Sequence, residues 1–411
     1  MSAILHLTTF LQGGAGRVIT ALASGQQRAG HEVTVVTSRA EVPGYGNYHA
    51  YLDQLCRCGV SVHLADSLFS RDYPQNLNVV RLLGALYSRA AEPDVIHAHA
   101  AIPSLIGLLF AGSRRASFPI VQTMHGWGIV KSAAQASTDV NLMNLVDRVV
   151  VPSRHAADQL ATLGVSPARI LRVPYGVPQM ACDDEACDRP GACCSGDTGC
   201  GPVSGHGDVA ADALAARMDL ARRQDVFVIA CVGTFGERKN QTLLVDAIAR
   251  LEGSRRVLAV FLGDGDAAPL ERRVRELGLA GVCAVHGYTA AARRLVGRAD
   301  AVILPSRSEG QPVTVLEAFA DGTVVAVSDI PELAELVEDD VTGVLFKTDD
   351  SRSLAAAIAR MIAMPATQRR RLRAEARAAY LSEFSEDAMM RRYFEAYRAA
   401  RDDRRAAAGV V

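Results

Sequence analysis

The sequence predicts an α/β protein built from two doubly wound domains that face each other across a cleft. Three observations support this prediction. Short apolar segments alternate with segments of helical periodicity in both halves of the chain. Several apolar segments end in glycine-rich or polar loops, which is typical of strands whose carboxyl ends bind ligands. A segment rich in Gly, Cys and Asp, residues 179–215, separates the two alternations and is expected to be a linker with an insertion.

Composition sets the broad class. A chain of 411 residues, 49% of them hydrophobic, is long for one core, so two or three domains are expected. The formal net charge of −1 argues against a nucleic-acid partner. No run of about twenty apolar residues is present, and the first residues read as a strand without the features of a leader. We therefore expect a cytoplasmic protein.

The first domain is expected at residues 1–178. Its strands are predicted at 3–8, 32–37, 58–64, 94–97, 119–123, 148–151 and 170–173, and its helices at 18–29, 79–90, 104–111 and 156–163. A glycine-rich loop after the first strand completes a βαβ unit. Gly14 and Gly16 have the first spacing of a dinucleotide-binding loop, but Ile19 stands where the third glycine belongs. The sequence therefore argues against a nicotinamide cofactor.

The second domain is expected at residues 216–385, followed by a C-terminal helix at 386–411 that packs back toward the first domain. Strands are predicted at 226–232, 257–262, 282–286, 301–304, 324–327 and 343–346. Helices are predicted at 211–222, 243–251, 270–277, 290–297, 331–337, 353–364, 368–380 and 387–400. One further helix is expected to have Pro312 at its first position and to end at Gly322.

That helix belongs to residues 301–322, the most informative stretch of the chain. An apolar strand ends at Pro305, a polar loop carries Glu309, and the helix carries Glu317. Backbone N–H groups at Gln311 to Val313 would suit a phosphate, and the carboxylates could accept hydrogen bonds from sugar hydroxyls. The stretch therefore suggests a site for a phosphate joined to a polyol. The alternative is an ordinary strand and helix with two surface glutamates.

Two groups among the nine cysteines are informative. Those at Cys231 and Cys283 lie in apolar surroundings and are expected to be buried. The linker contains Cys182, Cys187, Cys193, Cys194 and Cys200, with His206 nearby. These side chains could hold zinc or an iron–sulfur cluster, but none has C-x-x-C spacing. We favour a flexible insertion with free thiols and assign no metal and no cofactor.

Eight short motifs, in this order and spacing, resemble those of the GT-B fold glycosyltransferases, in particular the retaining family 4. They are GGAG (13–16), GHEV (30–33), PDVIHAH (93–99), TMHG (123–126), VPS (151–153), VPYGV (173–177), GDG (263–265) and PSRSEG (305–310). Two glutamates with seven residues between them are the family's best-known signature, and Glu309 and Glu317 match it. The resemblance covers almost the whole chain and implies two Rossmann-like domains, a nucleotide-sugar donor and no metal.

The resemblance also implies roles for single residues. Glu309 would lie beside the donor sugar, and Glu317 would bind the ribose hydroxyls. Lys239 would pair with the diphosphate, Gly14 would approach the phosphates from the first domain, and His125 would lie near the sugar hydroxyls. The expected catalytic group consists of Glu309, His125 and Lys239. The expected donor-binding group is Gly14, Arg238, Lys239, Gly310, Gln311, Pro312, Val313 and Glu317.

One departure from the family is Thr234, which stands where an Arg is common. It removes one expected phosphate cation, and Arg238 is the nearest substitute. The acceptor is expected to be a lipid-linked or cell-envelope glycan or a small molecule. A peripheral contact with the inner membrane surface is an alternative, because one predicted helix is rich in arginine. Its arginines are Arg369, Arg370, Arg371, Arg373 and Arg377. The alternatives are a nucleotide-sugar epimerase of the same fold and a non-catalytic binding or sensor protein that uses the cysteine segment.

Overall fold

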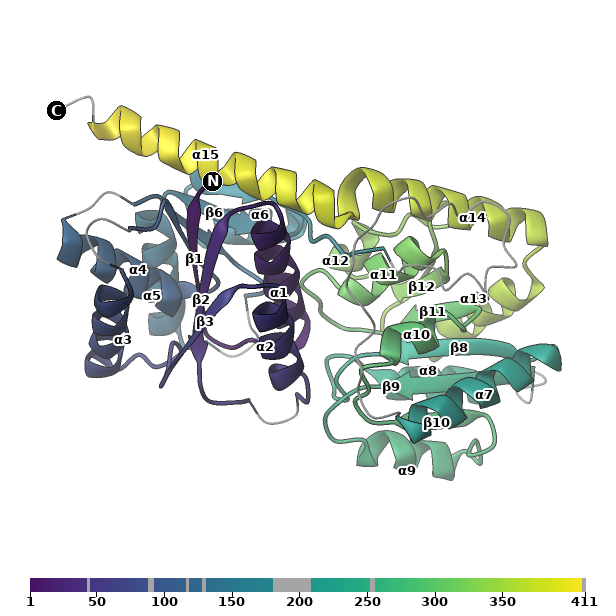
Figure 1. Ribbon diagram of the computed structural model, residues 1–411. Coiled ribbons are helices and arrows are strands. Elements are labelled where there is room, and N and C mark those ends of the chain that lie inside the picture. Colours follow the sequence, from purple (N-terminus) through teal and green to yellow (C-terminus); the bar gives the residue numbers. More distant parts are fainter. Residues whose placement is uncertain are drawn as a thin grey trace.

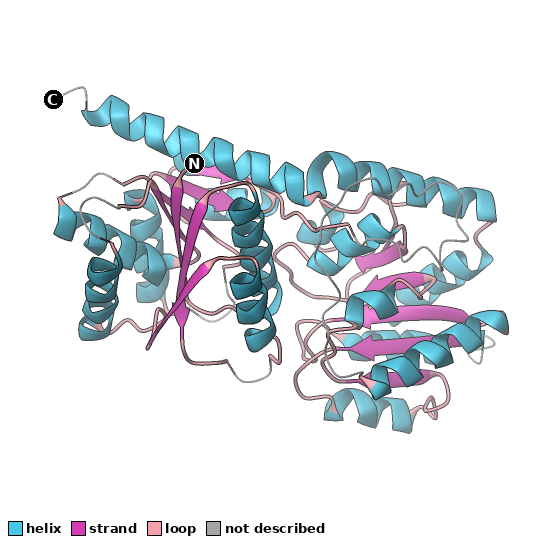
Figure 2. Cartoon of the chain, viewed as in Figure 1, coloured by secondary structure: helices cyan, strands magenta, loops and turns pink. Residues whose placement is uncertain are grey.

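The computed structural model describes residues 1–42, 45–87, 92–115, 118–127, 131–179, 208–251 and 256–408. These residues form two α/β domains with parallel sheets, placed side by side (Figure 1). Helices lie on both sides of the strands in each domain (Figure 2). The two predicted doubly wound, Rossmann-like domains are therefore confirmed.

The first domain contains a parallel sheet with the strand order β3-β2-β1-β4-β5-β6-β7. Its strands are β1 Ala3–Thr8, β2 Glu32–Ser38, β3 Ser61–Ala65, β4 Val95–Ala98, β5 Ile120–Thr123, β6 Arg148–Val151 and β7 Ile170–Arg172. Its helices are α1 Gly13–Arg28, α2 Tyr48–Arg57, α3 Tyr73–Leu86, α4 Ala101–Arg114, α5 Ala133–Leu145, α6 Arg154–Thr162 and the 3₁₀ turn η1 Pro167–Arg169. The strand order reverses between β1 and β4, which makes their carboxyl ends the expected ligand position.

The second domain contains a parallel sheet with the strand order β10-β9-β8-β11-β12-β13. Its strands are β8 Phe227–Val232, β9 Val257–Leu262, β10 Cys283–His286, β11 Ala301–Leu304, β12 Val324–Ser328 and β13 Val344–Phe346. Its helices are α7 Val209–Arg223, α8 Gln241–Ala249, α9 Ala268–Glu276, α10 Ala292–Val296, α11 Val313–Asp321, α12 Pro331–Ala334, α13 Ser351–Ala363 and α14 Ala366–Ala379. Here the order reverses between β8 and β11.

Both faces of the second sheet are covered by apolar packing. Along β8, Val228 and Ala230 belong to one core cluster, whereas Ile229 and Cys231 belong to another. Successive side chains of a strand point to opposite faces, so each cluster fills one side of the sheet. This explains why the strand is a continuous apolar run in the sequence. Cys231 and Cys283 are buried among these side chains, as predicted.

The end of the chain crosses from the second domain to the first. The π-helix η3 Tyr380–Phe384 follows α14, and α15 Glu386–Ala408 then runs over the first domain (Figure 1). Ion pairs fix α15 there, between Arg28 and Glu386 and between Arg404 and Asp147. The helix therefore connects the two domains and contributes side chains to the interior of the first.

Several sequence-based boundaries were wrong. The predicted glycine-rich loop is the first turn of α1, in which the Gly16 N–H donates to the Gln12 carbonyl at 2.9 Å. A Cβ on Gly16 would lie 2.6 Å from the Leu11 carbonyl carbon, so glycine is needed there for close approach. Pro312 is the residue before α11, which begins at Val313.

Two helices of the first domain were missed. In α2, Tyr48, Tyr51, Leu52 and Leu55 recur at i, i+3, i+4 and i+7 and pack into one core cluster, so an apolar stripe was present in the sequence. A signal was present for α5, because Ser132 and Gln135 form a capping box at its start. Strand β3 overlaps the strand predicted at 58–64, but it begins at Ser61 and ends at Ala65.

The cysteine-rich part of the linker lies outside the described residues. This applies to Cys182, Cys187, Cys193, Cys194, Cys200 and His206. After it, α7 begins at Val209 and packs against β8, so the packing of the second domain begins before residue 216. Within the described part of the chain, no helix combines the length and apolarity needed to cross a membrane.

Candidate active site

The loops that follow β8 and β11, the two strands at the reversal point of the second sheet, each contain a charged residue of the site. Lys239 lies in the loop that follows β8, and Glu309 lies in the loop that follows β11. Lys239 Nζ donates to Glu309 Oε1 at 2.6 Å, and Arg238 Nη1 lies 3.1 Å from Glu309 Oε2. The Ser306 hydroxyl also donates to Glu309 Oε1, at 2.6 Å. The sequence-predicted residues Glu309, Lys239 and Arg238 therefore meet.

Glu309 is 5% exposed and fully paired. Burial acts to raise the pKa of its carboxyl, but the charges of Lys239 and Arg238 outweigh burial and hold the pKa below its ordinary value. The stem of Lys239 passes close to Gly233, where an added Cβ would lie 3.1 Å from the Lys239 Cε, and the Gly233 φ of +153° also favours glycine. Two cations are therefore held at the carboxyl ends of β8 and β11.

Glu317 has a different partner. It lies on α11, is 7% exposed, and forms an ion pair with Arg17 on α1 of the first domain. Burial raises the pKa of Glu317 above its ordinary value, against the lowering effect of Arg17 and Arg293. The second glutamate is thus buried at the contact between the domains, and its partner comes from the opposite domain.

The backbones of the domains also approach closely beside Glu309. A Cβ on Gly310 would lie 2.6 Å from the His125 carbonyl oxygen, so only glycine fits there. The Tyr175 backbone N–H donates to Gln311 Oε1 at 2.5 Å. Gln311 Nε2 is buried and has no hydrogen-bond partner among the described residues. At these positions the predicted cleft is closed by direct contact.

His125 is half-buried, and both of its ring nitrogens are bonded to the first domain. Nδ1 lies 2.7 Å from the Tyr175 hydroxyl, and Nε2 lies 3.1 Å from His99 Nδ1. Burial lowers the pKa of His125 to about 4, so the ring is neutral at physiological pH. Neither ring nitrogen is free for a sugar hydroxyl in this arrangement.

Three more histidines lie behind His125. His6, His97 and His99 are buried, and their ring nitrogens approach closely enough to be a candidate metal group, the only one found among the described residues. Every ring nitrogen of the three, however, already has a hydrogen-bond partner from the protein. The arrangement fits a hydrogen-bonded network better than a metal site.

The first domain contributes two further features. Gly14 lies in the first turn of α1, where a Cβ would meet no atom within 4 Å, so the space beside it is open. The Gly46 N–H donates to Asp264 Oδ2 across the domain contact at 2.8 Å.

In the second domain, Thr234 lies against Gly265 in the turn after β9 and brings no charge, whereas Arg238 does reach Glu309.

Sequence reasoning missed Arg17, Ser306 and Tyr175 as site residues. Arg17 follows Gly14 by three positions on a helix, which is the spacing of neighbours on one face. That spacing was the available signal. Tyr175 belongs to a motif whose role could not be read without the fold.

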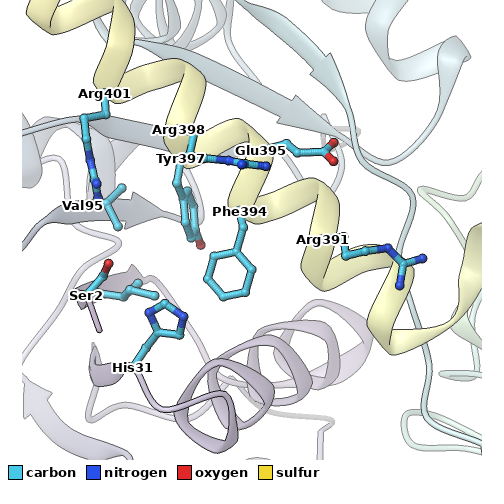
Figure 3. Close-up of a pocket in the computed structure, with 10 residues that line it drawn as sticks. Ser2, His31, Val95, Arg391, Phe394, Glu395, Tyr397, Arg398 and Arg401 are labelled. Atoms are coloured by element: carbon cyan, nitrogen blue, oxygen red, sulfur yellow. The ribbon is translucent and has the colours of Figure 1, made fainter.

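A separate cavity of about 510 Å³ lies on the opposite side of the first domain, between α15 and the amino ends of β1 and β4. Figure 3 shows Phe394 and Tyr397 pointing from α15 toward His31 and Ser2. The cavity lies away from Glu309 and Glu317 and is not part of the candidate active site.

Comparison with known proteins places the chain in a family. The model described as "Glycosyl transferases group 1" matches residues 214–379, and the model "Glycosyltransferase Family 4" matches residues 12–179. The two models together span both domains. The chain belongs to the GT-B glycosyltransferases of the family 4 type.

Curated relatives and solved structures agree with this assignment. A D-inositol 3-phosphate glycosyltransferase of Mycobacterium tuberculosis is 30% identical over 310 residues, which is 71% of this chain and 58% of that protein. One from Catenulispora acidiphila is 29% identical over 301 residues, 66% of this chain and 65% of that protein. The chain thus spans about three fifths of the length of the curated relatives that it matches.

Among solved structures, Anabaena HepE in complex with UDP and glucose has a TM-score of 0.75 and 19% identity, with 96% of this chain and 99% of that chain covered. Sucrose-phosphate synthase from Thermosynechococcus elongatus has a TM-score of 0.71 and 18% identity, with 96% and 98% covered. At this identity the likeness concerns the fold.

Proposed function

We propose that this protein transfers a sugar from a nucleoside diphosphate sugar to an acceptor hydroxyl, with retention of the anomeric configuration and without a metal. The observation that carries the proposal is the pairing of Lys239 and Arg238 with Glu309 at the carboxyl ends of β8 and β11. Two cations held at the reversal point of an α/β sheet suit a diphosphate. The names of the relatives and the UDP and glucose in a structure of the same fold support this donor class.

In this proposal the diphosphate takes over the two cations that Glu309 neutralises in the free protein. The bond between the anomeric carbon and the diphosphate oxygen breaks, and negative charge grows on the leaving oxygen. Lys239 and Arg238 stabilise that charge, together with the amino end of α11 at Val313. Gly310, Gln311 and Pro312 form the approach to that helix end.

The acceptor hydroxyl oxygen then bonds to the anomeric carbon from the face that the diphosphate leaves, and its proton passes to the leaving phosphate. No enzyme nucleophile is required in this scheme. Glu317 binds the ribose hydroxyls after Arg17 has moved from its carboxylate. Gly14 leaves room beside the phosphates, and His125 borders the sugar with its ring held by Tyr175 and His99.

The acceptor is proposed to enter from the first domain. A polyol phosphate is the first acceptor to test, because the relatives are named for inositol 3-phosphate. Lipid-linked glycans form the second class, and a requirement for vesicles in turnover would reveal a peripheral membrane contact. Two arginines of the predicted basic run pack against aromatic rings of the protein, Arg369 over Phe227 and Arg377 over Tyr380.

The test is a turnover assay over UDP, GDP and ADP sugars with inositol 3-phosphate and other polyols. We expect release of one nucleoside diphosphate, unchanged by EDTA, and a product with the donor's anomeric configuration by ¹H NMR coupling constants. A product of inverted configuration would contradict retention, and loss of turnover in EDTA would contradict metal independence. Conversion of the donor sugar without transfer would indicate an epimerase. No turnover with any donor and acceptor pair would contradict the transferase proposal.

A further inference from the structure

A continuous chain of hydrogen bonds runs from the candidate active site to the C-terminal helix through the interior of the first domain. It starts at Tyr175 and His125 and passes through His99 and His6 to Gln26 on α1. The links are 2.7 Å from Tyr175 Oη to His125 Nδ1, 3.1 Å from His125 Nε2 to His99 Nδ1, 2.9 Å from His99 Nε2 to His6 Nδ1, and 2.7 Å from His6 Nε2 to Gln26 Oε1. His125 is half-buried, and the other side chains of this chain of hydrogen bonds are buried.

The chain continues into α15. Gln26 Nε2 donates to the Tyr397 hydroxyl at 3.0 Å, and that hydroxyl lies 2.8 Å from His97 Nδ1. His97 Nε2 lies 2.7 Å from Thr123 Oγ1, which lies 3.1 Å from the Tyr393 hydroxyl. Tyr397 points from α15 toward the sheet (Figure 3). The last helix of the chain therefore reaches the same network as a residue beside the candidate active site.

The positions of the ring protons on His6, His99 and His125 follow from one amide. A neutral imidazole has one donor and one acceptor nitrogen, and an amide oxygen only accepts. Burial lowers the pKa of His6 to about 4 and the pKa values of His97 and His99 well below the ordinary range, so these rings are neutral. With the Gln26 oxygen facing His6, the His6 proton must be on Nε2.

The same logic fixes the next rings in turn. His6 Nδ1 must accept, so His99 carries its proton on Nε2, and His125 does likewise. His125 Nδ1 then accepts from the Tyr175 hydroxyl. If the Gln26 amide were reversed, every proton in this branch would move to the other nitrogen. The chain thus has two directions, and the partners of one side chain select between them.

We propose that Gln26 and Tyr397 are positioning residues that set the tautomer and ring orientation of His125 through His6 and His99. Tyr397 holds the amide in place by accepting from Gln26 Nε2, and with this bond made the Tyr397 hydroxyl proton is left for His97 Nδ1. The consequence for activity rests on the proposed function, because it matters only if His125 borders the donor sugar. The consequence for tautomers is independent of any activity.

The experiment uses the full chain labelled with ¹⁵N-histidine and a long-range ¹H–¹⁵N correlation spectrum of the ring nitrogens. The His125 signals are assigned by their loss in His125→Gln. In the wild type we expect a protonated, pyrrole-type Nε2 and an unprotonated, imine-type Nδ1. Tyr397→Phe removes the acceptor that orients the amide, so the two His125 signals should move toward each other as the tautomers mix.

Tyr393→Phe is the matched control, because it deletes a buried hydroxyl from the same helix at the far end of the network. It leaves the Gln26 to Tyr397 bond in place, so the His125 signals should stay at their wild-type positions. Gln26→Leu, which removes the amide at similar volume, provides a second route if Tyr397→Phe does not fold. It should mix the His125 tautomers as well.

The proposal is overturned if His125 shows the opposite tautomer in the wild type or keeps wild-type signals in both Tyr397→Phe and Gln26→Leu. An equal shift in Tyr393→Phe would also overturn it, because it would indicate general loosening of the helix. With an active donor, kcat should fall in Tyr397→Phe, because the His125 ring that borders the sugar loses its fixed orientation, whereas kcat and KM should stay unchanged in Tyr393→Phe. Absence of turnover in the wild type would count against the proposed function and leave the spectra as the test here.

Discussion

The two glutamates of the candidate active site are alike in burial and opposite in electrostatics. Glu309 is paired within its own domain, by Lys239, and its pKa is held below the ordinary value. Glu317 is paired across the domain contact, by Arg17, and its pKa is raised. One carboxylate is therefore part of a charge cluster within its own domain, whereas the pairing of the other depends on where the opposite domain lies.

The comparison suggests different tasks. Both cations that pair with Glu309 belong to its own domain, so this part of the site is built without side chains of the first domain. The ion pair of Glu317 with Arg17 forms only when α1 lies against α11, whereas Arg293 of its own domain also lowers the pKa of Glu317. Displacement of Arg17 by ribose hydroxyls would therefore couple donor binding to the domain contact.

The largest expected effect is that of Lys239→Ala. Removal of a preorganised cation that stabilises a leaving group costs about 10² to 10³ in kcat. Initial rates with the best nucleotide sugar measure it. Lys347→Ala is the matched control, because Lys347 is an exposed lysine of the same domain that pairs with Asp329. An unchanged kcat in Lys239→Ala would contradict the proposed role of Lys239 at the diphosphate.

The second expected effect separates the two glutamates by stability. A group with a lowered folded-state pKa contributes stability above its unfolded pKa, and that stability is lost as pH falls. Glu309 is such a group, so Glu309→Gln should lower the free energy of unfolding at pH 7, by about 3 kcal/mol for a broken buried pair.

Glu317 should show the opposite sign. A raised folded-state pKa contributes stability that is present below the unfolded pKa and lost as pH rises through the folded pKa. Glu317→Gln mimics the protonated form, so Tm at pH 7 should stay equal or rise. Thermal melts of both variants from pH 4 to pH 8 measure this. Equal losses of Tm at pH 7 would show that the two carboxyls do not differ as described.

The third expected effect concerns donor affinity. Hydrogen bonds to a charged group contribute about 1.5–3 kcal/mol, so Glu317→Gln should weaken donor binding about tenfold to a hundredfold. Arg17→Ala keeps the carboxylate and removes its competitor, so it should bind donor at least as tightly as the wild type. Calorimetric titration with the donor distinguishes them. Weaker binding in Arg17→Ala would mean that Arg17 itself contacts the ligand.

The smallest expected effect is on pH dependence. Arg17 opposes the rise in the pKa of Glu317, so its removal should raise that pKa further. Donor affinity falls at acid pH as Glu317 becomes protonated, and this fall (the acid limb) should begin at higher pH in Arg17→Ala. Arg294→Ala removes an exposed arginine that pairs with Asp212 and should leave the limb in place. A shift toward lower pH in Arg17→Ala would contradict the assigned role of Glu317.

Local patterns in the sequence predicted what is local in the structure. The strand at Ala301–Leu304 and the left-handed turn at Gly322 follow from an apolar run and a helix-ending glycine. The positions of Glu309 and Lys239 follow from strand ends at the same edge of a sheet. These features depend on periodicity and turn chemistry, which a single sequence contains.

The features that the sequence did not predict depend on tertiary placement. The direction of the Arg238 side chain and the partner of Glu317 are decided by how loops and domains meet. The histidine network joins residues as far apart as His6 and Tyr397, and no local pattern signals such a contact. The segment GGAG at 13–16 was predicted as a loop for another reason: the same residues suit both a loop and a tightly packed helix start.

The most direct test of the two-glutamate site is a thermal-shift comparison of the wild type, Lys239→Ala and Glu317→Gln over a panel of nucleotide sugars. Binding at a hundred times Kd stabilises a protein by about 2.7 kcal/mol. We expect one class of nucleotide sugar to raise the Tm of the wild type and to raise the Tm of both variants much less. An equal rise in all three proteins, or no rise in the wild type with any nucleotide sugar, would contradict it.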